Sequence, residues 1–353
     1  MSAETSLPPH LWITLCTFGV IGASLGGMTI SLEVRRLLQR AGHPSERPFT
    51  AEQIGASHQR LSELVSEGQL RRVVRGVYLD NAVRDTLTTR ARALALVVPS
   101  MAVVTDRTAA WLHGVDVLLP GEDKLVPKVH VFDRRVGSRV RRGAANSGQR
   151  TMPDSDVMRV GGVAVTTPLR TAIDLGRQRW PDQAFAQAEA MVRAGVGVDE
   201  ILRELPRFAG YRWIRQFREI APLLDPRPQS VRESVMRFRW LSTGQPAPEP
   251  QRPVIGPQGQ TWWLDLGVDE LYFAVEYDGR EFHKGWANEE HDRKRRSWIE
   301  EHTPWTVKVI CDENLFGADA DFEMALPAWI REARRTLPER LRRGRRWYDA
   351  VGD

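Results

Sequence analysis

Acidic side chains gather in a short stretch near the C-terminus, in a pattern that could hold a divalent cation. Asp265 and Glu276 lie in two segments that alternate polar and apolar residues, and Asp278 follows two positions later. Carboxylate oxygens are the ligands that Mg²⁺ or Mn²⁺ prefers. A bound cation lowers the pKa of a coordinated water and offsets the charge of a phosphate. The stretch therefore indicates metal-dependent phosphodiester hydrolysis.

Two antiparallel strands are expected to position these carboxylates. A two-residue turn at Asp269–Glu270 would pair Asp265 opposite Ala274 and leave Glu276 as its diagonal neighbour, roughly 7–8 Å away. Alternation places Glu276 and Asp278 on one side of the second strand. The same alternation is also typical of the solvated face of an ordinary antiparallel hairpin.

The spacing in this stretch resembles that of a domain related to the very-short-patch-repair endonucleases. The matching residues are Asp265, Glu276, Tyr277, Asp278, Gly279, His283, Asp292, Arg295, Pro304 and Trp305, with a strand at residues 306–310. That domain belongs to the PD-(D/E)xK nuclease superfamily, in which a mixed sheet flanked by helices holds one or two Mg²⁺ ions. The resemblance covers about residues 228–316.

This resemblance implies that Asp265 and Glu276 are metal ligands. Asp278 would be a third ligand or a partner of a metal-bound water, at the position where the superfamily usually has its lysine. Without that lysine, activation of water needs another group. The candidates are His283 as general base and Lys294 on the following helix, which could also stabilise phosphate charge, as could Arg295.

Glu233, on a helix expected to begin at Ser230, has two interpretations. In the resembled family a glutamate at this place approaches the metal site. Ser230 and Glu233 also form the pattern of a capping box, in which the glutamate satisfies a free backbone N–H. Both interpretations stay open.

The whole chain has the composition of a folded multidomain protein. Its 353 residues can hold two or three domains of the α+β or α/β class, and 42% of them are hydrophobic. The net charge of +5 and the pI of about 9.5 favour an anionic partner such as DNA. Cys16 and Cys311 are too few for a disulfide framework or a cysteine zinc site, which fits the cytoplasm, and no small-molecule cofactor is expected.

An apolar leader occupies residues 1–30. Residues 7–30 contain no charged side chain and are long enough to resemble a membrane span, although glycine, serine and threonine dilute them. Met28 offers another translation start, which would make residues 1–27 an artefact or a disordered leader. A membrane or partner-binding helix and packing into the core are the alternatives, and a membrane role is the less favoured one.

Residues 31–80 have the layout of a winged helix-turn-helix. Ser31–Arg40 predicts a first helix, the capping box Thr50–Gln53 opens a short second one, and Ser57 caps a third. Residues 70–79 alternate as a strand pair around Arg75. Helix, turn, helix and basic β-wing in this order favour DNA binding, although small helical units also serve for packing or dimerisation.

In the DNA-binding interpretation, the third helix enters the major groove and the wing holds phosphates. The groove residues would be Ser57, His58, Gln59 and Arg60. The phosphate contacts would come from Arg71, Arg72 and Arg75.

Three blocks in the N-terminal half resemble the AbiEi family of antitoxins from type IV toxin–antitoxin systems. They are GQLRRVVRGVYLD, DRTAAWLHG at Asp106–Gly114 and GGVAVTTPLRTAIDLGR at Gly161–Arg177, within about residues 33–180. The resemblance implies a winged helix that binds operator DNA, and a cognate toxin or defence-system protein as partner. This chain departs from the family by continuing into the nuclease-like stretch.

The predicted organisation is an AbiEi-like α/β middle domain at residues 81–226, a nuclease-like domain at 227–337 and a basic tail at 338–353. The prolines at 226 and 228 mark the main boundary, and Pro246–Pro253 is expected to be a stiff connection. We expect a DNA-binding, Mg²⁺-dependent endonuclease of bacterial or phage defence. The alternative is a non-catalytic regulator or antitoxin with a degenerate nuclease fold.

Overall fold

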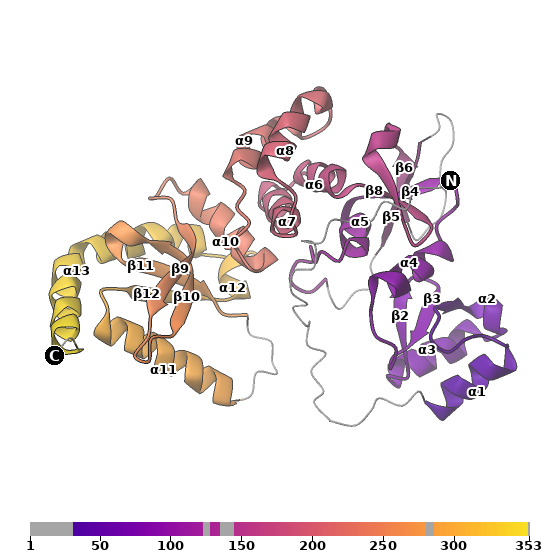
Figure 1. Cartoon of the computed structure of the whole chain (residues 1–353), viewed down its shortest axis with the longest axis horizontal. Coiled ribbons are helices and arrows are strands. Elements are labelled where there is room, and N and C mark those ends of the chain that lie inside the picture. The colour runs from indigo at the N-terminus through magenta and orange to yellow at the C-terminus, as the bar shows by residue number, and fades with distance from the viewer. Residues whose placement is uncertain (1–30, 123–127, 135–144, 280–285, 352–353) are drawn as a thin grey trace. The chain divides into compact units, whose positions relative to one another are not determined.

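The computed structural model describes residues 31–122, 128–134, 145–279 and 286–351 (Figure 1). The chain divides into two compact units. The first unit comprises Met1–Gln178 and Ala194–Pro222, and the second comprises Arg179–Arg193 and Leu223–Asp353. Within the described residues, no helix has both the length and the apolar character needed to cross a membrane. The leader at residues 1–30 lies outside the described residues.

The N-terminal module of the first unit combines three helices with a small antiparallel sheet. Its elements are α1 (Leu32–Arg40), β1 (Phe49–Thr50), α2 (Ala51–Ile54), α3 (His58–Ser66), β2 (Leu70–Val74) and β3 (Val77–Asp80). The strand order is β1-β3-β2. Local capping fixes where the helices begin, because Thr50 and Gln53 form a reciprocal capping box and the Ser57 hydroxyl accepts the Arg60 N–H. The capping predicted from the sequence is confirmed.

A five-stranded mixed sheet dominates the rest of the first unit, in the order β6-β5-β4-β8-β7. Its strands are β4 (Ala102–Val104), β5 (Val129–Asp133), β6 (Ala145–Gln149), β7 (Val157–Val160) and β8 (Val163–Thr166). Its α-helices are α4 (Leu87–Ala95), α5 (Asp106–Leu112), α6 (Pro168–Gly176), α8 (Val198–Glu204) and α9 (Ile214–Ile220), with 3₁₀ turns at Asp154–Asp156, Leu205–Phe208 and Ala221–Leu223. Leu94, Leu112 and Val165 belong to one core, which joins α4 and α5 to the sheet.

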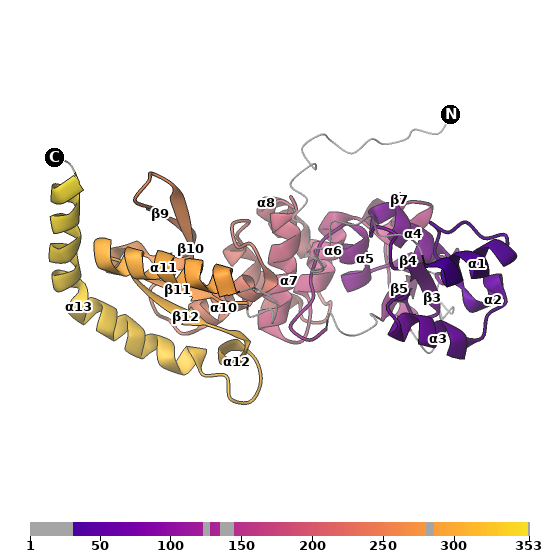
Figure 2. The same ribbon diagram turned by 90° about the horizontal axis from the view of Figure 1, so that it is seen from below.

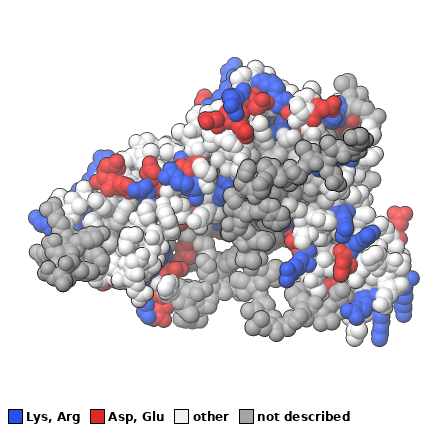
Figure 3. Space-filling model, in the orientation of Figure 1, with Lys and Arg blue, Asp and Glu red and all other residues white. Residues whose placement is uncertain are grey.

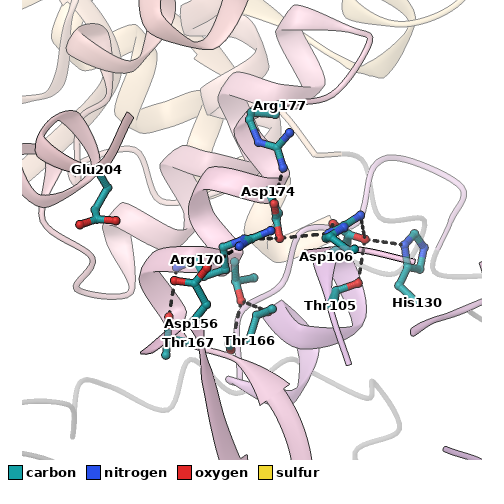
Figure 4. A network of polar contacts seen from close by, with 12 residues as sticks. Thr105, Asp106, His130, Asp156, Thr166, Thr167, Arg170, Asp174, Arg177 and Glu204 are labelled. Carbon is teal, nitrogen blue, oxygen red and sulfur yellow. Dashed lines mark hydrogen bonds and ion pairs between the residues drawn. The ribbon is translucent and has the colours of Figure 1, made fainter. Parts of the chain in front are cut away.

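A buried ionic network lies within this unit (Figure 4). Arg170, only 2% exposed, donates from Nε to Asp174 at 2.9 Å and from Nη1 to Asp156. Arg150 donates through both Nη atoms to Asp106, at 2.7 and 3.0 Å, and also to Asp174 at 3.0 Å. Buried charges persist only when they are paired in this way. The network therefore ties the start of α5 and the last turn of α6 to Arg150, which follows β6.

The second unit is built on a four-stranded mixed sheet in the order β12-β11-β10-β9. Its elements are α7 (Pro181–Arg193), α10 (Val231–Ser242), β9 (Glu249–Ile255), β10 (Thr261–Val268), a 3₁₀ turn (Asp269–Leu271), β11 (Phe273–Tyr277), α11 (Trp286–His302), β12 (Thr306–Ile310), α12 (Asp312–Leu315) and α13 (Phe322–Val351). Strands β9, β10 and β11 pair antiparallel, whereas β11 and β12 run parallel.

Helices cover both faces of this sheet. Trp240 of α10 and Ile330 of α13 share a core with Phe273 on one face. On the other face, Ile299 of α11 packs with Leu264. Figure 1 shows α11 on its own side of the strands. The parallel pairing of β11 and β12 requires a crossover, which α11 supplies.

The hairpin register corrects the predicted pairing of the carboxylates. Gly267 pairs with Ala274, so the pairing of Asp265 opposite Ala274 was wrong. The reason is the connection, which is a 3₁₀ turn followed by Tyr272 at a φ of 44° rather than a two-residue turn. The ladder ends at the Leu266–Val275 pair, and just beyond it the Asp265 carboxylate accepts the Tyr277 N–H.

Two further expectations for the second unit were wrong. Glu249–Ile255 is the edge strand β9, not a stiff connection, because prolines are tolerated where no neighbour needs their N–H. The basic segment from residue 338 is part of α13, which Figure 2 shows as one long bent helix with Pro327 and Pro338 inside it. Arg340, 6% exposed, donates to the carbonyls of Leu271 and Ala333 and so belongs to the fold.

Candidate functional site

Asp265 sits at an irregularity of the sheet in the second unit. The β9–β10 ladder pairs Leu264 with Arg252 and Leu266 with Pro250, and Gln251 between them has a φ of 53°. Residues other than glycine seldom adopt this backbone conformation, so the surrounding structure must enforce it. The irregularity interrupts the ladder in the manner of a bulge, at the position of Asp265.

The Asp265 carboxyl is half-buried and lies near other acids. Its Oδ2 accepts the Tyr277 N–H at 2.8 Å. Burial raises the pKa of Asp265 well above its usual value, and the nearby charges of Glu233 and Glu276 raise it further. Like charges that share a low-dielectric site disfavour ionisation in this way. The carboxylates of α10, β10 and β11 therefore act on one another.

Glu233 reaches this site from the first turn of α10. It is 8% exposed, and its Oε2 accepts the Gln229 N–H at 2.8 Å and the Gln251 side-chain amide at 3.0 Å. Ser230 caps the helix by accepting the Glu233 N–H at 3.1 Å. Burial raises the pKa of Glu233. Glu233 thus satisfies a backbone N–H, and its charge also acts on Asp265. Its interpretation as a capping residue and its interpretation as a metal-site residue therefore both keep a physical basis.

Glu276 is held by a cation of the protein itself. Both of its carboxylate oxygens accept from Nη2 of Arg295 on α11, each at 2.8 Å, and Arg296 lies 3.8 Å away. Burial raises the pKa of Glu276, although the charge of Arg295 opposes this. The site therefore already contains one positive charge placed against a carboxylate.

The donor chemistry fits a hard divalent cation, since the carboxylates of Glu233, Asp265 and Glu276 lie near enough for their charges to interact. The arrangement is nevertheless not a finished metal cage. Over the described parts of the chain, no three His, Cys, Asp or Glu side chains are grouped closely enough to hold an ion. Binding would require Glu276 to share or release Arg295.

The other predicted site residues differ in how they are placed. Asp278 follows β11, is half-buried and donates its N–H to the Ile310 carbonyl at 2.8 Å. Lys294 is 73% exposed and pairs with Glu290 at 2.8 Å, which directs it along α11. His283 lies outside the described residues.

The predicted DNA-contacting residues lie on α3 and the β2–β3 hairpin. His58 and Gln59 are exposed at the start of α3, and Arg75 is exposed at the hairpin turn. Figure 3 shows basic side chains over this module interspersed with acidic ones. An exposed helix start and an exposed basic turn are features that can meet a groove and its phosphates.

Four of the predicted contacts are engaged within the protein. Arg71 donates to the carbonyls of Asp80 and Asn81, and burial lowers its pKa. Arg72 lies over the Tyr78 ring at 5.5 Å. Arg60 donates hydrogen bonds to Glu33 and Glu63, which raise the pKa of its guanidinium above the usual value. Ser57 caps α3, so its side chain has a structural role too.

Comparison with known proteins shows what this chain is similar to. Residues 101–225 match the family model of the AbiEi antitoxin C-terminal domain, which confirms that resemblance for this part of the chain. Two relatives in strains of Mycobacterium tuberculosis, the uncharacterized proteins Rv2248 and MT2308, are each 32% identical over 268 residues, which covers 73% of this chain and 91% of the relative. The chain belongs to the same family as Rv2248 and MT2308.

Sequence reasoning missed Gln251 and the buried network of the first unit. Gln251 was assigned to a connection, and its importance arises only from the backbone conformation opposite Asp265. A signal for the network did exist. Arg170 and Asp174 are spaced i, i+4 in an otherwise apolar segment, and a charged pair on a buried helix face must find partners.

Proposed function

We propose that this protein is a cytoplasmic DNA-binding protein of the AbiEi type whose second unit is a metal-dependent phosphodiesterase. The observation that carries the catalytic part is the partly buried Asp265 carboxyl, whose pKa the nearby charges of Glu233 and Glu276 raise. Acidic groups that raise one another's pKa are unfavourable as an apo structure, and a bound Mg²⁺ or Mn²⁺ would relieve this.

The order of elements in the second unit supports the proposed nuclease fold. Helix α10, strands β9, β10 and β11, helix α11 and strand β12 form a mixed sheet flanked by helices. Glu233, Asp265 and Glu276 come from its first helix and its two central strands. These are the places from which the resembled nuclease domain takes its acidic ligands.

Each residue has a proposed role. Glu233, Asp265 and Glu276 would hold the ion, which would supply an activated water and charge stabilisation when bound. Asp278 would contact a metal-bound water. Arg295 would move from Glu276 to the phosphate, because a guanidinium suits both partners.

Two further proposed roles concern proton transfer and the phosphate. His283 remains the proposed general base. Lys294, directed toward Glu290 in this structure, would assist only after a change of rotamer.

DNA binding is proposed for the N-terminal module. Its order of helices and strands, with α3 preceding the β2–β3 hairpin, supports a winged helix. His58, Gln59 and Arg75 are its exposed candidates for contact. The AbiEi domain match supports a role in a toxin–antitoxin or defence setting, with a cognate toxin as a further proposed partner.

A non-catalytic regulator is the second candidate, and one observation favours it. Arg295 occupies both oxygens of Glu276, so the carboxylate is already neutralised without a metal. Asp278 stands in place of the lysine that the resembled superfamily uses, which also suits a fold that binds DNA without cutting it.

Cleavage of supercoiled plasmid by the full-length protein with Mg²⁺ or Mn²⁺ distinguishes these candidates. Asp265→Ala and Glu276→Ala should abolish nicking, whereas Asp269→Ala, in the adjoining turn, should not. If the wild type binds DNA tightly but leaves the plasmid intact with either metal, the regulator is the better account.

A further inference from the structure

The first unit contains a cavity that the proposed function does not use. Its volume is about 530 Å³, within the usual range of ligand sites of roughly 300–1,000 Å³. It is lined by Asp106, Arg107, His130, Gln149, Arg150, Thr151, Asp174, Arg177, Gln178, Tyr211, Arg212 and Trp213. All of these residues fall within the segment that matches the AbiEi antitoxin C-terminal domain.

Backbone strain is concentrated at this cavity. Among the described residues, four non-glycine residues have positive φ, and two of them line it: Asp106 at 50° and Trp213 at 64°. A bulky tryptophan in this region is a true outlier, because its Cβ meets the neighbouring carbonyl. Such conformations persist where surrounding structure enforces them, and they cluster at binding sites.

The lining carries a surplus of positive charge. Four arginines and two aspartates contribute side chains, and Arg107 also pairs with Glu122 outside the lining, which leaves a formal surplus of one positive charge. Arg177 donates to Asp174, yet its Nε has no acceptor among the described residues and its side chain is 9% exposed. A buried N–H without a partner calls for an explanation, and an anionic ligand supplies one. Figure 4 shows Arg177 above Asp174, at the edge of the buried network.

Aromatic rings lie beside these cations. The Arg177 guanidinium is 5.0 Å from the Tyr211 ring centre, and Arg212 is 5.3 Å from that of Trp213. Trp213 is 36% exposed. Aromatic surfaces next to arginines are what an aromatic base and a phosphate require together, since the base stacks and the phosphate is paired.

We propose that this cavity binds a nucleotide, with the phosphate at Arg177 and Arg150 and the base stacked on Trp213. The buried network explains how the site is prepared. Asp106 and Asp174 hold the guanidinium of Arg150 in place, so that its orientation is set before the ligand arrives. The strained Trp213 backbone directs the indole ring to the cavity.

Equilibrium binding of ATP, GTP, inorganic phosphate and a short oligothymidylate to the full-length protein tests this inference. The first variant is Trp213→Gly, because glycine adopts positive φ without strain and the fold should be retained. Loss of the stacked base should weaken nucleotide binding at least about tenfold, whereas phosphate binding should be unchanged. Arg177→Gln should weaken phosphate and nucleotide together.

A matched control exists in the second unit. Trp180 is also exposed, at 55%, and its neighbour Arg179 lies 4.7 Å from its ring centre. Trp180→Ala should leave every affinity unchanged. The probes distinguish two kinds of ligand. A site for a free nucleotide should bind ATP or GTP, whereas a site for one nucleotide of a single strand should bind the oligothymidylate. The inference fails if neither arm binds, or if binding is the same in the Trp213→Gly variant.

Discussion

Removal of the Arg295 charge should expose the electrostatic cost of the acidic site. Arg295→Met keeps the apolar stem of the side chain but leaves Glu276, whose side chain is 6% exposed, without its main partner. Breaking a buried ion pair by removing one member typically costs about 3–5 kcal/mol. Arg296, 3.8 Å away, remains and softens the effect, so we expect a loss of about 2–3 kcal/mol in unfolding free energy.

The penalty should depend on pH with a definite sign. Burial raises the pKa of Glu276, and Arg295 opposes that rise, so the variant should raise the pKa further. A carboxyl whose pKa is higher in the folded state favours folding fully below its unfolded pKa and loses that contribution as pH rises through its folded pKa. The variant should therefore be close to wild type near pH 4 and least stable, relative to wild type, above neutrality.

The assay is urea unfolding of the metal-free protein at several pH values, beside Lys294→Met as the matched control. Lys294 precedes Arg295 on the same helix and is 73% exposed, so its loss should change stability by less than about 0.5 kcal/mol. Added Mn²⁺ should raise the stability of the Arg295→Met protein more than that of the Lys294→Met protein, because the ion replaces the lost positive charge. Equal penalties for the two variants, or a penalty that is the same at low and high pH, would refute this reasoning.

Three further outcomes follow from the contacts. Burial raises the pKa of Glu189 to about 7, so the stability of the second unit should fall as pH rises through 7. Glu189→Gln should flatten that fall in urea unfolding, and an unchanged pH dependence would contradict the prediction. A Cβ at Gly176 would lie 2.1 Å from a ring carbon of Phe217, so Gly176→Ala should lower the free energy of unfolding by about 2–3 kcal/mol. An unchanged melting temperature of this variant would contradict that prediction. Arg75→Ala should lower the salt dependence of DNA binding by about one phosphate contact without loss of stability. Arg71→Ala should instead destabilise the N-terminal module, because Arg71 bonds to backbone carbonyls. The opposite pattern would exclude the hairpin turn from DNA contact.

Local features of the chain were predictable where neighbouring residues determine them. Thr50 with Gln53, Ser57 and Ser230 mark helix starts because a side-chain oxygen satisfies a backbone N–H three residues away. The hairpin at Arg75 followed from alternation and a glycine. These signals need no knowledge of the rest of the fold.

The site depended on longer-range features that local patterns do not contain. A turn of four residues instead of two changed the partner of Asp265, since each added residue shifts the register. Gln251 became important only through its backbone conformation beside Asp265. Arg295 was expected to meet phosphate, yet in the structure it meets Glu276, because α11 packs on the face of the sheet that carries Leu264 and Ala274.

Mn²⁺ binding to the full-length protein, followed by electron paramagnetic resonance, tests the central claim most directly. The central claim is that Glu233, Asp265 and Glu276 together hold a divalent cation. The expected result is a bound Mn²⁺ signal that Asp265→Asn removes and that Asp269→Asn, in the exposed turn beside Arg252, preserves. A wild-type protein that binds no Mn²⁺, or a signal unchanged by Asp265→Asn, would contradict the claim.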